Sequence, residues 1–231
     1  MLLPAHEVYQ MTAAPLRFRD ERLMLDPAGA AFWPAKRVLI AADAPFAAAM
    51  PGFGAPPADS RGALERLNRL VRLYRPAKVI MLGHGGPTGM ARLHKEELAR
   101  LTAMAREANF LWVGPEGADL PGGCVSVHRE GPFTFRHEPS PKLAPREIEI
   151  CGALRPWASI DVRAKRVSRP CFVADSNRLM LPAFGANGTG LDVREPGIAR
   201  LFPRGLRVFL LGQEQLYSFA LEQLGRMPEV A

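Results

Sequence analysis

The sequence predicts an α/β fold in which two β-sheets pack together with helices on the outside. In the first half, three short apolar runs alternate with two helical patterns, and short connections of this kind imply parallel strands with right-handed crossovers. In the second half, short strand patterns follow one another around turn residues, which favours antiparallel pairing. The 231 residues suit a single domain over residues 16–231, preceded by an arm at residues 1–15.

The elements of the first half are predicted from apolar periodicity. Continuous apolar runs indicate buried strands, and leucines at helical spacing indicate helices that cover a sheet. A hairpin is expected at the start, with alternating strands around Asp20 and Glu21. In chain order, the predicted elements are the hairpin 16–25, a strand at 37–43, a helix at 61–74, a strand at 77–83, a helix at 93–108 and a strand at 110–114.

The second half is predicted to be a series of short strands. One turn is expected at residues 175–177, where Asp, Ser and Asn follow each other between two apolar runs. The predicted strand segments are 124–129, 133–139, 148–152, 159–166, 169–184 and 206–219.

Composition limits the classes of partner. The net charge of +7 and pI of about 9.8 attract polyanions, although 25 of the 30 basic residues are scattered arginines without a run of like charge. A DNA partner is therefore permitted without being required. Three widely spaced cysteines give no disulfide framework or zinc motif, so Cys124, Cys151 and Cys171 are expected to be small buried side chains.

Targeting signals are not evident. No apolar run approaches the ~18 residues that span a bilayer, and the first residues lack a basic segment followed by an apolar one. A cytoplasmic protein without a membrane partner is expected.

Chemistry is expected where the predicted strands end, because open α/β sheets bind ligands at the carboxyl ends of their parallel strands. The polar residues at these positions are Asp43, His84 and Glu116, with His137 at the end of a strand in the second half and Arg155 shortly after another.

Four segments carry a resemblance to a known family. They are "DPAGAAFWPAKRVLIAAD" (26–43), "PAKVIMLG" (76–83), "FRHEP" (135–139) and "RPCFVADSNRLMLPAFGANGTGLDV" (169–193). The chain resembles the ligase-associated DNA-damage-response endonucleases of the calcineurin-like metallophosphoesterase superfamily over roughly residues 16–218. The resemblance implies an αββα sandwich of two packed mixed β-sheets flanked by helices.

The resemblance also implies where a metal site would lie. In that family, Asp-x-His, Gly-Asp, Gly-Asn-His-Asp, His-Glu-Pro and Gly-His-x-His-Pro motifs hold two divalent ions, which generate a hydroxide and clamp the phosphate. Asp43 and His137 match the first Asp and the His before Glu-Pro. The other positions depart from the family: Pro45 replaces the first His, His84 the bridging Asp, Pro115 the Asn, Glu116 the His that assists cleavage, and Ala153 and Arg155 the two closing His.

These departures predict that two ions cannot be held, because proline, alanine and arginine supply no ligand. Two other uses of the site stay open. Asp43, His84, Glu116 and His137 could hold one Mn, Zn or Fe ion, with Glu116 or Arg155 as the catalytic candidates. Alternatively, Arg155 and His84 could bind a phosphate without metal. Asp43 and His137 could also be purely structural.

Three functions are therefore weighed. The preferred hypothesis is a degenerate metallophosphoesterase, a binding or scaffold protein in bacterial DNA repair beside an ATP-dependent DNA ligase and a helicase, a context that the resemblance alone implies. One rival is an active phosphoesterase or endonuclease with a reduced metal site. The other rival is a non-catalytic DNA-binding module. The oligomeric state is left open.

Overall fold

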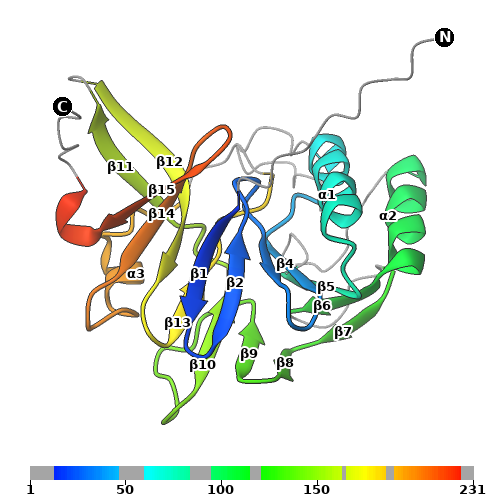
Figure 1. Cartoon of the computed structure of the whole chain (residues 1–231), viewed down its shortest axis with the longest axis horizontal. Coiled ribbons are helices and arrows are strands. Elements are labelled where there is room, and N and C mark those ends of the chain that lie inside the picture. The colour runs from blue at the N-terminus through cyan, green and yellow to red at the C-terminus, as the bar shows by residue number, and fades with distance from the viewer. Residues whose placement is uncertain are drawn as a thin grey trace, which may run out of the picture.

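The computed structural model describes residues 13–46, 60–83, 95–114, 121–162, 165–185 and 190–224. Within these ranges, two β-sheets lie against each other, and two long helices cover the outside of the first sheet (Figure 1). No helix in the described part of the chain is both long enough and apolar enough to cross a bilayer.

The first sheet has the strand order β1-β2-β3-β4-β5-β6-β7. Strands β1 to β4 pair antiparallel, and β4 to β7 pair parallel. Helices α1 and α2 lie between the parallel strands along the chain, so the predicted strand–helix alternation is confirmed. The bounds are β1 Ala14–Phe18, β2 Glu21–Leu25, β3 Ala31–Trp33, β4 Val38–Ala42, α1 Ser60–Tyr74, β5 Lys78–Leu82, α2 Lys95–Glu107, β6 Asn109–Val113 and β7 Gly123–Val125.

The second sheet has the order β15-β14-β12-β13-β10-β9-β8, with β11 paired to β12. Strand β10 runs parallel to β9 and β13, and the other pairs are antiparallel. The bounds are β8 Val127–Glu130, β9 Phe133–Arg136, β10 Ile148–Cys151, β11 Trp157–Val162, β12 Lys165–Ala174, β13 Arg178–Met180, α3 Pro196–Ala199, β14 Arg207–Leu211, β15 Leu216–Ala220 and the 3-10 helix η1 Leu221–Gln223.

Apolar residues from both sheets form the central core. The inner faces of the two sheets meet through aromatic side chains such as Trp33 and Phe133. Their rings pack edge to face, with the ring centroids 4.8 Å apart. A second cluster joins the first sheet to α1 and α2, and α1 contributes Leu64, Leu67 and Val71 at the predicted helical spacing. The outer face of the second sheet carries a third cluster, covered among the described residues by α3 of four residues and the segments around it.

The chain start differs slightly from the prediction. Strand β1 begins at Ala14, inside the segment predicted as an arm, because Ala14 and Pro15 pair with Leu25 and Met24. Residues 1–12 of that arm lie outside the described residues.

The cysteine prediction holds for two of three residues. Cys151 and Cys171 are fully buried, and burial raises the pKa of both thiols well above the ordinary value, so they remain protonated. The prediction is wrong for Cys124, which is exposed because β7 lies at the edge of the first sheet.

Candidate functional site

The carboxyl ends of strands from both sheets meet at one place. Asp43 follows β4, and its N–H donates to the carbonyl of Leu82 at 2.9 Å. His137 follows β9 of the second sheet, and its carbonyl accepts from the Gly152 N–H at 3.0 Å. The two matched positions of the sequence, Asp43 and His137, are thus brought together although they lie 94 residues apart along the chain.

Asp43 and His137 are in direct contact. His137 Nε2 lies 2.8 Å from Asp43 Oδ1, and the Ala153 N–H donates to Asp43 Oδ2 at 3.0 Å. The Asp43 side chain is 4% exposed and that of His137 is 22% exposed. A buried carboxylate requires hydrogen-bond partners on both oxygens, and here the protein supplies them.

Glycines at the ends of two strands make this contact possible. Gly83 follows β5 and has φ +80°, and a Cβ added there would lie 2.4 Å from His137 Nε2. Gly152 follows β10, and a Cβ added there would lie 2.7 Å from the Cβ of Ala42. The imidazole of His137 therefore packs directly against the backbone of Gly83. Any residue with a Cβ at this position would occupy the space that the imidazole fills.

The backbone around the carboxylate is strained. Asp43 has φ 48°, Ala153 has φ 64° and Arg155 has φ 46°, and all three lie in the left-handed region that L-residues disfavour by about 1–2 kcal/mol each. Such conformations cluster at sites where the surrounding structure enforces a particular geometry. Arg19, Arg37, Arg75 and Arg146 also have positive φ, so the strain supports a site at this edge only together with the contacts of Asp43.

The remaining candidates are only partly described. Arg155 is exposed, and its guanidinium makes no hydrogen bond or ion pair with another residue in the described part of the chain. Its backbone carbonyl packs closely against Gly190, where an added Cβ would collide with it. His84, Pro115 and Glu116 lie outside the described residues, so the four-residue metal site and the metal-free phosphate site stay predictions.

The described residues alone do not supply the donors for two metal ions. Asp43 and His137 are the matched donors, and the imidazole nitrogen and one carboxylate oxygen already bond to each other. Ala153 supplies only its N–H, and Arg155 carries a cation that supplies no ligand to a metal ion. The described part of the chain contains no cluster of three or more His, Cys, Asp or Glu side chains that could hold an ion.

A buried ion pair anchors the segment that carries His137. Arg178 Nε donates to Glu149 Oε2 at 2.6 Å, and Glu149 Oε1 accepts from the Ser140 N–H at 2.9 Å and from Arg136 Nη1 at 3.2 Å. Arg178 Nη1 also donates to the carbonyl of Leu201 at 2.7 Å. Both charged side chains are almost fully buried. Sequence reasoning missed this pair, although an acidic residue inside the apolar strand "IEIC" and an arginine at the start of "RLML" were the available signals.

Sequence comparisons give no match to any family model or to any curated protein. Structural comparison finds similarity to the crystal structure of nuclease MPE from Pseudomonas putida, with a TM-score of 0.67 and 24% identity. The match covers 90% of this chain and all of that one. The predicted fold class is thereby confirmed: the chain has the calcineurin-like fold of two packed, mixed β-sheets.

Proposed function

We propose that this chain is a degenerate metallophosphoesterase that binds DNA without cleaving it by a two-metal mechanism. The observation that supports the proposal most is the closed set of contacts at Asp43. Its carboxylate is satisfied by His137 Nε2 and by the Ala153 N–H, so both oxygens serve to join the two sheets. Two-metal hydrolysis requires these same oxygens and nitrogens to face the ions.

Residues that cannot bind metal at the expected ligand positions also support the proposal. Two ions activate water by lowering its pKa and clamp the phosphate for in-line attack. With Ala153 and Arg155 in the closing motif and Pro45 after Asp43, the chain supplies too few donors to hold the pair of ions. Water at this edge then keeps its ordinary reactivity, and a bound phosphodiester is not attacked.

DNA is the proposed ligand for two reasons. The similar structure is that of a nuclease, and the net charge of +7 favours a polyanion. A scaffold role in DNA repair beside an ATP-dependent ligase and a helicase rests on the family resemblance alone, as does a cytoplasmic location.

A reduced metal site is the second candidate. The placement of a carboxylate and an imidazole at one edge favours it, provided that an ion takes the place of the 2.8 Å contact between Asp43 and His137. Together with His84 and Glu116 they would form a four-ligand set for a single Mn, Zn or Fe ion. Without a metal, Arg155 and His84 could instead bind a phosphate at the same edge, and the site would then bind its ligand without catalysis.

A hydrolysis assay separates these possibilities. The purified chain is incubated with bis-p-nitrophenyl phosphate and Mn²⁺, and we expect no turnover above that of Asp43→Asn, which keeps the size of the side chain. Asp161→Asn, an exposed carboxylate on β11, is the matched control. Turnover that is lost in Asp43→Asn and kept in Asp161→Asn would establish the second candidate and end the degenerate one.

A further inference from the structure

Three arginines line a groove at the end of the first sheet where β4 and β5 begin, opposite the end at which Asp43 follows β4. We propose that this groove binds the sugar–phosphate backbone of double-stranded DNA, independently of sequence. The inference rests on the proposed function, because it names the surface through which a non-cleaving DNA-binding protein would contact its ligand.

The groove lies where three elements end. It has a volume of about 490 Å³, within the range of sites that bind small groups. Arg37 comes from the turn before β4, Arg72 and Arg75 from the end of α1 and the residue after it, and Glu107 from the end of α2. The lining residues are Arg37, Val71, Arg72, Arg75, Pro76 and Glu107.

The charge in the groove is not neutralised by the described residues. Three arginines and one glutamate line the groove, and no ion pair within 4.0 Å involves any of the three arginines in the described part of the chain. Arg37 Nη2 donates to the carbonyl of Arg75 at 2.6 Å, which fixes its position and leaves its other N–H donors free for a ligand. Like charges held together in this way favour binding of an anion.

Two of the arginines have an energetically unfavourable backbone conformation. Arg37 has φ 53° and Arg75 has φ 43°, both in the left-handed region. The carbonyl of Arg37 accepts from the Ala77 N–H at 2.8 Å, which ties this turn to the start of β5. A favourable interaction with the end of the α1 dipole, worth about 0.3–1 kcal/mol, explains a cation at Arg72. It does not explain a third arginine from another element.

The groove's chemistry favours phosphate over a protein partner. A guanidinium presents a planar fork of donors that matches phosphate oxygens. The apolar lining is limited to Val71 and Pro76, so the groove lacks the aromatic anchor that protein interfaces use. Without an aromatic ring among the lining residues there is also no platform on which unpaired bases could stack, which points to the backbone of a duplex.

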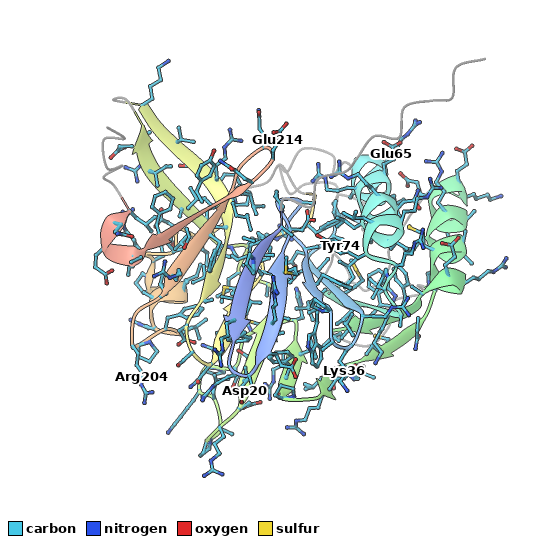
Figure 2. All side chains as sticks on the ribbon, in the orientation of Figure 1. Asp20, Lys36, Glu65, Tyr74, Arg204 and Glu214 are labelled. Atoms are coloured by element: carbon cyan, nitrogen blue, oxygen red, sulfur yellow. The ribbon has the colours of Figure 1, made fainter. Side chains whose placement is uncertain are left out.

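The position of the groove fits binding without cleavage. Arg37 precedes β4 and Asp43 follows it, so the length of the strand, roughly 20 Å, separates them. Figure 2 shows Lys36, the neighbour of Arg37, at the lower end of the first sheet, well below Glu65 in the first half of α1. DNA bound in the groove would contact a different edge from the one that carries Asp43 and His137.

The test measures duplex DNA binding as a function of salt for the full chain and two double variants. Arg72→Gln/Arg75→Gln removes two groove contacts, and we expect the slope of log K against log salt to fall by about two. Arg200→Gln/Arg204→Gln makes the same charge change on exposed residues near α3, and we expect a much smaller fall in slope. Arg204 lies on the far side of the second sheet from Lys36 (Figure 2).

The outcomes are distinct. An equal fall in the salt slope in both double variants would overturn the groove as the DNA-binding site, while DNA would remain the proposed ligand of the chain. Absence of binding by the unchanged chain would overturn both the groove and DNA as the proposed ligand. Binding of poly-glutamate as tightly as duplex DNA of equal charge would overturn the assignment of the groove to nucleic acid. Circular dichroism of each variant confirms that the fold is retained.

Discussion

Arg178→Met is expected to lower the free energy of unfolding by about 3–5 kcal/mol, because it leaves the Glu149 carboxylate buried without its main partner. Glu149 is 0% exposed and Arg178 is 2% exposed, so water cannot replace the lost interaction. Arg136 lies 3.2 Å from the other Glu149 oxygen and compensates only in part. Urea denaturation at neutral pH measures the change.

A double variant distinguishes a lost partner from lost packing. Glu149→Leu/Arg178→Met removes both charges, and we expect it to be more stable than Arg178→Met alone, because no isolated charge remains buried. Arg200→Met, on an exposed residue, is the control and should change stability by less than about 0.5 kcal/mol. A double variant that is less stable than either single variant would show that the pair itself stabilises the sheet.

Gly83→Ala is expected to lower the free energy of unfolding by about 3 kcal/mol or more. Two costs add: an alanine in the left-handed region costs about 1–2 kcal/mol, and the displaced His137 leaves Asp43 short of a partner. The new Cβ would lie 2.4 Å from His137 Nε2 and 2.5 Å from its Cδ2, so the ring must move. Thermal and urea unfolding of the variant measure the total.

Gly205→Ala separates the two costs. Gly205 has φ +91°, close to that of Gly83, but a Cβ there would meet nothing within 4 Å. This variant should therefore show the backbone cost alone. Equal destabilisation by Gly83→Ala and Gly205→Ala would contradict the close packing of His137 against the end of β5.

The β4-α1-β5-α2-β6 part of the first sheet was predictable because its signals are local, whereas β3 and the place of β7 in this sheet were not predicted. The strand at residues 38–42 is a continuous apolar run, and Leu64, Leu67 and Val71 repeat at helical spacing in α1. The meeting of Asp43 and His137 also followed from their positions at strand ends, together with the resemblance. These features depend on residue type and order alone.

The finer geometry was not predictable, since it depends on contacts between segments far apart in the chain. The bond from Ala153 to Asp43 spans 110 residues and uses a backbone N–H, which has no sequence signature. Two residues that line the groove, Arg37 and Arg75, adopt left-handed conformations that residue identity disfavours. The full set of contacts at Asp43 becomes visible only when both sheets are in place.

Metal content tests most directly the proposal that the chain holds no pair of metal ions. The purified chain is equilibrated with Mn²⁺, Zn²⁺ or Fe²⁺, freed of loosely bound ions by gel filtration, and analysed by elemental mass spectrometry beside Asp43→Asn. We expect far less than one ion per chain, and no difference between the two proteins. Two ions per chain that disappear in Asp43→Asn would contradict that proposal.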